Sequence, residues 1–143
     1  MTPQERAARL RECAAVIATI PPEEFNLCHW WLPEGMAFDD DRNRMYRVAD
    51  GPCGCPVGHL VRNGRIHGLR FDSLSRLEDQ QVVPPSPAAR ERIFVLVGSE
   101  FGLSYEIAQF MFDQYSYNGR DTSAAAVIRR MEFICGEIER GSL

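Results

Sequence analysis

The sequence contains no lysine: all 16 basic residues are arginine, and 20 acidic residues give a net charge of −4. The arginines are spread along the chain instead of forming one stripe. Non-specific binding to nucleic acid depends on many cationic contacts to phosphates, so this balance argues against a nucleic-acid partner. Arginine suits bidentate recognition of carboxylate or phosphate, but a GC-rich genome that favours arginine codons explains its use equally well.

Long apolar runs are also lacking. None approaches the roughly 18 residues that a membrane span needs, and the N-terminus, Met-Thr-Pro-Gln-Glu-Arg, is polar and charged. We therefore expect neither membrane insertion nor export by a recognisable signal. The five cysteines are an odd number, which without a secretion signal argues against a disulfide framework. The sequence predicts free thiols in a reducing, cytoplasmic compartment.

Length and periodicity predict the fold class. A chain of 143 residues with 45% apolar content suits a single helical domain over 1–143. Apolar residues at helical spacing predict a first helix over Pro3–Thr19, a central helix over Ala88–Phe101 and a last helix from Asp121 or Thr122. The predicted class is all-α or mainly α, a compact bundle of about five to seven helices. The shorter helices are expected at Pro56–Arg62, Ser73–Gln80 and Ser104–Gln114.

Residues 32–52 lose this periodicity and are rich in turn formers, which predicts an exposed loop with at most one short strand pair. Asp39, Asp41 and Asn43 follow the order of a calcium loop superficially. Arg44 stands where such a loop needs glycine, so a solvated acidic loop is the favoured interpretation.

Three motifs occur in a familiar order. Phe25-Asn-Leu-Cys-His-Trp30 is followed by Cys55-Pro-Val-Gly-His59 and then by a Gly-Leu-Ser turn at 102–104. This order resembles a family of small uncharacterised bacterial and phage proteins with the pattern Phe-x-x-x-x-Trp, Cys-x-x-Gly-His or -Trp, and Gly-Leu-Ser. The chain departs from the pattern in its upstream cysteine, only two residues before Cys55, and in a longer loop before it. The resemblance implies a helical domain, often carried by mobile elements, with no established activity to transfer.

The densest cluster of chemically active residues is Cys53-Gly-Cys55-Pro-Val-Gly-His59. Thiolates and imidazole are the ligands that zinc prefers, and Cys28 or His29 would complete a tetrahedral set. The two cysteines are separated by one residue, whereas a zinc knuckle usually has two residues between its cysteines. Free cysteine is also commonly buried in protein cores. Buried structural thiols are therefore favoured over a zinc site of Cys53, Cys55, His59 and Cys28.

A second cluster is basic. Arg62, Arg65, His67 and Arg70 surround the turn formers Asn63-Gly64 and Gly68. A flexible turn would present their donors to an anion or to an acidic partner. A solvated basic loop balanced by nearby acids is the simpler interpretation.

Catalytic signatures are missing. The sequence has no Gly-x-Ser-x-Gly, no phosphate-binding loop and no dinucleotide fingerprint. We expect no cofactor and hypothesise a non-catalytic interaction protein, an accessory factor of a phage or mobile element that modulates a host system. Its partner would be another protein, bound through the 32–52 loop or the 62–70 turn. The alternatives are a zinc-stabilised module and a cysteine-dependent enzyme.

Overall fold

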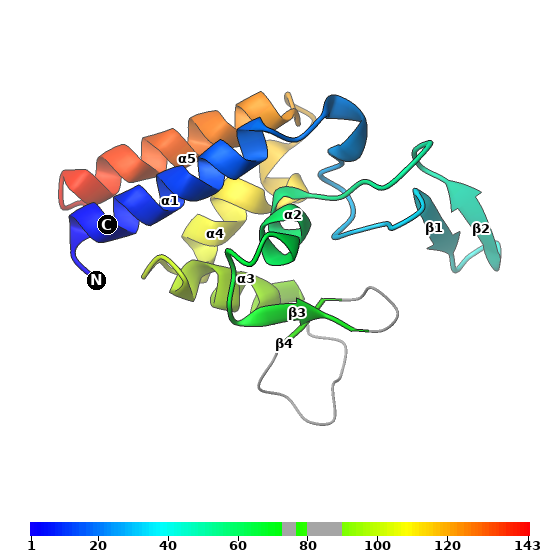
Figure 1. The fold of residues 1–143 in the computed structure, drawn as a ribbon, viewed down its shortest axis with the longest axis horizontal. Coiled ribbons are helices and arrows are strands. Elements are labelled where there is room, and N and C mark those ends of the chain that lie inside the picture. Colours follow the sequence, from blue (N-terminus) through cyan, green and yellow to red (C-terminus); the bar gives the residue numbers. More distant parts are fainter. Residues whose placement is uncertain (73–76, 80–89) are drawn as a thin grey trace.

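Two long antiparallel helices form one side of the molecule (Figure 1). The computed structural model describes residues 1–72, 77–79 and 90–143. Helix α1 (Pro3–Ala18) packs along α5 (Ala124–Glu139), which brings the two chain ends close together. A capping box begins α1, since the Thr2 hydroxyl accepts from the Glu5 N–H and the Glu5 carboxylate accepts from the Thr2 N–H. The first helix therefore lies where the sequence predicts it, and the last begins at Ala124 after the cap Ser123, later than the predicted start at Asp121 or Thr122.

The α1–α5 interface has a buried apolar centre and an ion pair at its rim. Leu10 and Ile17 of α1 are fully buried, as are Val127 and Met131 of α5. At the rim Arg11 forms a bidentate salt bridge with Glu139, with N–O distances of 2.9 and 2.7 Å. An exposed pair of this kind contributes little to stability, because water and salt screen it. The buried apolar side chains therefore contribute more to the stability of this interface than the ion pair does.

Helix α4 (Tyr105–Phe112) packs against α5, and helix α3 (Arg90–Ser99) packs against α4. Helix α3 confirms most of the predicted central helix Ala88–Phe101: residues 88–89 lie outside the described ranges, and the helix ends at Ser99, before Phe101. A methyl group on Gly98 would lie 2.6 Å from the Leu103 carbonyl oxygen, so glycine permits the tight turn into α4. After α4 the short helix η2 (Gln114–Tyr117) buries Tyr117, whose hydroxyl donates to the Met111 carbonyl at 2.6 Å.

Two antiparallel hairpins make the fold mixed, so the predicted all-α or mainly α class is wrong. Strands β1 (Met36–Asp39) and β2 (Arg44–Arg47) form a pair within the 32–52 segment, where the sequence allows one. Strands β3 (Leu69–Phe71) and β4 (Leu77–Asp79) form a second pair that the sequence does not predict.

The helix predicted over Ser73–Gln80 is wrong where the structure describes it, at 77–79; the rest of that prediction lies outside the described residues. Leu69 and Leu77 are buried, and both strands contact α3. Tertiary packing overrides the weak helical pattern here.

The segment 53–60 is buried without interruption and leads into α2 (Pro56–Arg62). The segment 24–32, which begins at the last residue of the short helix η1 (Pro22–Glu24), is hydrogen-bonded to residues 53–55. The Gly54 N–H donates to the Glu24 carbonyl at 3.0 Å, and the Cys55 N–H donates to the His29 carbonyl at 2.7 Å. Leu32 and Cys53 exchange two backbone hydrogen bonds of 2.8 and 3.1 Å. The two segments therefore hold each other in place.

Glycine is required where these segments meet. A methyl group on Gly58 would lie 1.7 Å from the Trp30 carbonyl oxygen, and one on Gly54 would lie 2.6 Å from the same atom. Because Gly54 and Gly58 carry no side chain, the backbone of Trp30 and Trp31 can lie directly on α2. The Trp30 ring then packs on Phe94 of α3, with ring centroids 5.7 Å apart.

We expect Gly58→Ala to lower the free energy of unfolding by about 2 to 4 kcal/mol, because backbone must move to admit the methyl group. Gly51→Ala is the matched control, since a methyl group there meets no atom within 4 Å. Urea unfolding of both variants measures the difference. Equal stability of the two variants would contradict the close contact at Gly58.

Candidate functional site

The structure gives the Cys-Gly-Cys-Pro-Val-Gly-His motif a packing role. Cys53 and Cys55 are buried, and the Cys55 Sγ lies 3.8 Å from the Trp30 carbonyl oxygen. His59 is buried too, and its Nε2–H donates to the Glu24 carbonyl at 2.7 Å. The Trp31 and His59 rings are nearly perpendicular, with ring centroids 5.2 Å apart. These polar atoms therefore have partners that belong to the fold.

Within the described ranges no three Cys, His, Asp or Glu side chains gather as a metal-ligand group. Cys28, the fourth predicted ligand, is exposed, whereas Cys53 and Cys55 are buried. The Nε2 atom of His59 is directed at a backbone carbonyl. The zinc site of Cys53, Cys55, His59 and Cys28 stays a prediction, and the contacts above favour structural thiols.

The thiols are all free, and four of the five are buried. Burial raises the pKa of Cys55 to about 12 and the pKa values of Cys13 and Cys135 to about 11, and it raises the pKa of Cys53 as well. A cysteine nucleophile needs a lowered pKa, because the thiolate is the reactive form. These four residues therefore stay protonated at neutral pH.

The predicted basic site at 62–70 does not converge. The Arg62 guanidinium lies 3.8 Å from the Trp31 ring centroid, whereas Arg65 Nη1 lies 3.4 Å from a Glu12 carboxylate oxygen. The His67 side chain faces Glu100 instead, with 3.4 Å between Nδ1 and Oε2. Arg70, the fourth residue of the prediction, is also engaged in an interaction. Arg62, Arg65 and His67 face three different partners, so these side chains do not form one anion cradle.

Glu100 explains the conformation of this turn. Its carboxylate is almost covered and accepts from the backbone N–H groups of His67 and Gly68, the latter at 3.2 Å. Arg9 of α1 donates to the same carboxylate at 2.8 Å. The acidic partner of the turn is thus supplied by the residue that follows α3 within the chain, which the sequence around 62–70 could not indicate.

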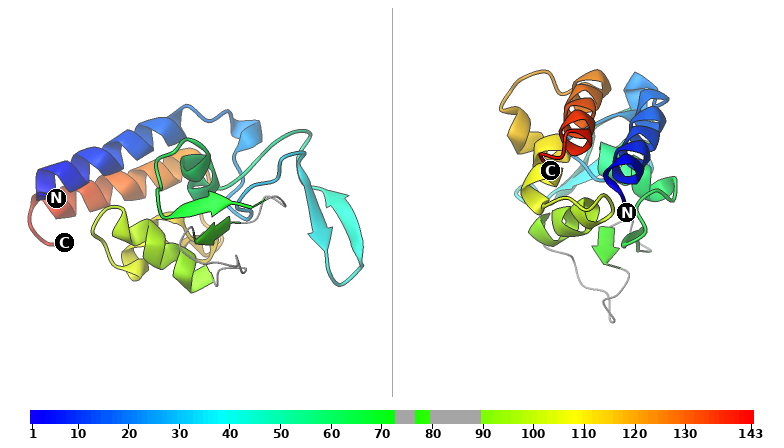
Figure 2. Two further views of the ribbon diagram at one scale, coloured as in Figure 1. Left: turned by 60° about the horizontal axis from the view of Figure 1, so that its bottom comes forward. Right: turned by 90° about the vertical axis from the view of Figure 1, so that its left-hand side faces the viewer.

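The β1–β2 hairpin projects away from the helices (Figures 1 and 2). Its turn is closed by Asp39, whose Oδ1 accepts from the N–H groups of Asp41 and Arg42 at 3.0 and 3.3 Å. Asn43 follows in the left-handed region, with φ of +51°. The acidic run that resembles a calcium loop therefore contains the turn of a hairpin.

The root of the hairpin is equally well defined. Gly35 has φ of +72°, and its carbonyl accepts from the Val48 and Ala49 N–H groups at 2.8 and 3.2 Å. A methyl group there would lie 2.3 Å from the Ala49 carbonyl oxygen. Glycine at this position lets the two strands leave the body side by side.

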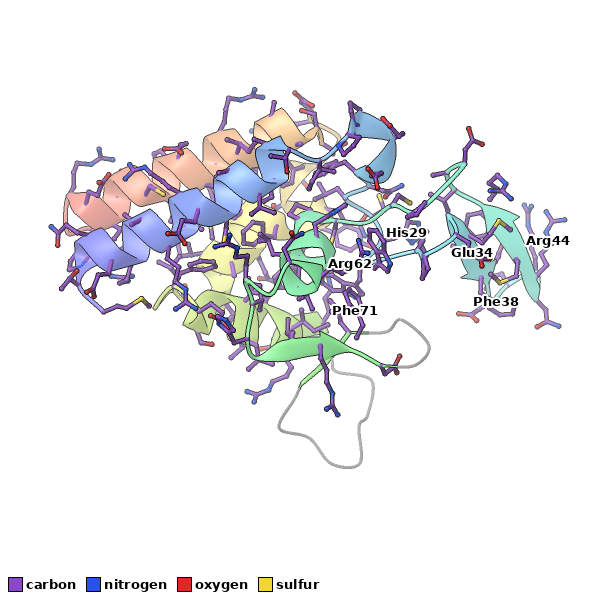
Figure 3. All side chains as sticks on the ribbon, viewed as in Figure 1. His29, Glu34, Phe38, Arg44, Arg62 and Phe71 are labelled. Atoms are coloured by element: carbon purple, nitrogen blue, oxygen red, sulfur yellow. The ribbon has the colours of Figure 1, made fainter. Side chains whose placement is uncertain are left out.

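Large apolar side chains are exposed on this hairpin. Phe38 and Met45 lie opposite each other in the strand register and are 52% and 54% exposed. Tyr46, on the other face, is exposed too. Phe38 and Arg44 lie well away from the helices in Figure 3. Sequence reasoning identified the segment but missed this apolar face, for which the alternation of Met36 and Phe38 was the available signal.

Comparison with protein-family models, curated proteins and solved structures finds no match. Among the described residues, no helix combines the length and the apolar character that crossing a membrane requires. The geometry of the chain's own residues is therefore the basis of a functional proposal.

We expect Cys28 to react with iodoacetamide far faster than the other cysteines at pH 7.5, since Cys28 is exposed. The buried thiols should react only when the structure opens locally. Peptide mass mapping over time measures the rates, and Cys28→Ser should remove the fast phase. A fast reaction at Cys53 or Cys55 would instead support the cysteine-dependent enzyme.

His59 should make the free energy of unfolding decrease at acidic pH. Burial lowers the pKa of His59 below its ordinary value of 6.5, so the unfolded chain binds a proton more readily than the folded one. The associated stability is present above pH 6.5 and is lost as the pH falls below it. Urea unfolding between pH 7 and 5 should show a smaller loss for His59→Gln, with exposed His67→Gln as control. A pKa of 6.5 or higher for His59, measured by NMR titration, would contradict this prediction.

Proposed function

We propose that the protein is a cytoplasmic, non-catalytic accessory factor of a phage or mobile element that binds a host protein through the β1–β2 hairpin. The observation that carries the proposal is the exposed pair of Phe38 and Met45 on a hairpin that projects from the body. The resemblance of the sequence motifs to small phage and bacterial proteins supports the biological setting.

The composition of the hairpin suits a protein interface. Interface cores are enriched in aromatic residues, methionine and arginine. Within 36–47 the hairpin combines these types: Phe38, Arg42, Arg44, Met45, Tyr46 and Arg47. Covering such side chains contributes about 25 cal/mol for each Å² of apolar surface removed from water. Aromatic and arginine side chains also dominate binding energy at interfaces.

The backbone of the hairpin supports the same proposal. Each of its strands pairs only with the other within the described residues, so each has an outer edge without a strand neighbour. An extended segment of a partner can add to such an edge through main-chain hydrogen bonds. The Asp39 turn and the Gly35 root fix the hairpin before binding, which reduces the ordering cost.

Other parts of the chain suit binding or catalysis less well. Arg62 stacks on Trp31, and Arg65 and His67 face Glu12 and Glu100, so these side chains do not converge on the alternative docking site. The raised pKa values of the buried thiols favour a non-catalytic role over a cysteine nucleophile.

Replacing Phe38 and Met45 together by serine should strongly weaken partner binding without destabilising the fold, because both side chains are exposed. The control is Tyr115→Ser, which removes an exposed aromatic ring from η2. A host protein captured from bacterial extract by the wild type and by the control should be lost with the double variant. Calorimetry with that purified protein should show an affinity at least about tenfold weaker.

Thermal unfolding of the three proteins checks that they are equally folded. Capture that is unchanged by the hairpin substitutions would show that the partner binds elsewhere and would contradict the proposed function.

A further inference from the structure

An exposed aromatic pair lies where α4 packs against α5. Phe110 of α4 and Phe133 of α5 face each other edge to face, with ring centroids 6.3 Å apart. Phe133 is 56% exposed although it lies in the middle of a helix. A shallow pocket beside the two rings is lined by Tyr117, Arg120, Asp121, Ala126, Arg129 and Arg130. We call this pocket with its two phenylalanines the α4–α5 surface.

Arg130 is held rigidly at the centre of this surface. Its Nη1 donates to the Phe110 carbonyl at 2.7 Å and to the Ser116 hydroxyl at 2.9 Å. Its Nη2 donates to the Ser116 carbonyl at 3.1 Å. The guanidinium carbon also lies 3.7 Å from the Tyr117 ring centroid. These contacts fix the cation before any ligand arrives, which lowers the cost of binding.

The acceptors around Arg130 are all uncharged. A guanidinium carries five N–H donors, and the three bonds above leave the Nε–H and one Nη2–H without a partner in the described part of the chain. These two donors form one edge of the guanidinium plane. A carboxylate matches such an edge with two parallel hydrogen bonds.

The surroundings add positive charge. Arg120 and Arg129 line the same pocket, and Asp121 is the one carboxylate among its lining residues. Asp121 already accepts from the Ser123 N–H at 2.9 Å and lies 3.4 Å from Arg129. Three arginines against one aspartate make the pocket basic on a chain whose net charge is −4.

We infer that the α4–α5 surface binds an acidic peptide segment of a partner protein, one that carries a large apolar side chain. A carboxylate of the peptide pairs with the open edge of Arg130, and neighbouring acids face Arg120 and Arg129. The apolar side chain packs on Phe110 and Phe133. This site shares no residue with the β1–β2 hairpin, so it stands independently of the proposed function.

The test uses a fluorescein-labelled peptide, Gly-Asp-Glu-Asp-Phe-Asp-Glu-Asp-Gly, and fluorescence anisotropy at low ionic strength. Arg129→Glu and Phe133→Ser should each weaken binding by about tenfold or more, and added salt should weaken it further. Arg44→Glu is the matched control, with the same charge change on the hairpin, and should bind the peptide with little change. In NMR spectra the Arg130 Nε–H resonance should shift on binding.

Peptide binding that Arg44→Glu abolishes and Arg129→Glu leaves intact would place the ligand on the hairpin and overturn the inference. Equal binding of a peptide with asparagine and glutamine in place of the acids would also overturn it, since carboxylates would then not be recognised. Absence of binding by the wild-type protein at millimolar peptide would do the same.

Discussion

The contact between the Trp30 carbonyl and Gly58 is the constraint on which the rest of the structure depends. It allows the segment 24–32 to lie on α2, and the hydrogen bonds of this segment then satisfy backbone groups of the buried residues Cys53, Gly54 and Cys55. The same contact brings Trp30 against Phe94 and so joins the segment to the helical core. The chain departs from this point through the Leu32–Cys53 bridge, which is the base of the β1–β2 hairpin. Gly58, a residue without reactive groups, therefore determines where the β1–β2 hairpin, the proposed binding element, projects.

The parts of the fold that could be predicted are those with local causes. Helix α1 begins with a capping box, and α5 has apolar residues at spacings of three and four, so both are specified by short stretches of sequence. The β3–β4 pair has no such signal, because three-residue strands are too short to show alternation. Leu77 is buried by its partner strand and by α3, which the sequence around it cannot reveal. The helix predicted at 73–80 is wrong at 77–79 for that reason.

The candidate sites show the same limit. Cysteine and histidine in one short motif indicate zinc ligands by residue type, but both types are also packed in cores, and the two glycines of the motif are the more informative residues. The basic residues at 62–70 are close in sequence, yet their partners come from Trp31, Glu12 and Glu100. Convergence of side chains is a property of the fold, so proximity along the chain does not establish it. The α4–α5 surface combines two helices and a turn and has no contiguous motif at all.

The two proposed binding surfaces differ in physical character, and this difference matters for how they would work together. The β1–β2 hairpin exposes a largely apolar pair, whose contribution depends on buried area and hardly on salt. The α4–α5 surface depends on arginines, whose long-range attraction accelerates encounter and weakens with ionic strength. Both surfaces belong to one chain, so a partner held at one raises the effective concentration of its other segments near the second. Charge at α4–α5 would then govern the rate of association, while the hairpin would govern how long the complex lasts.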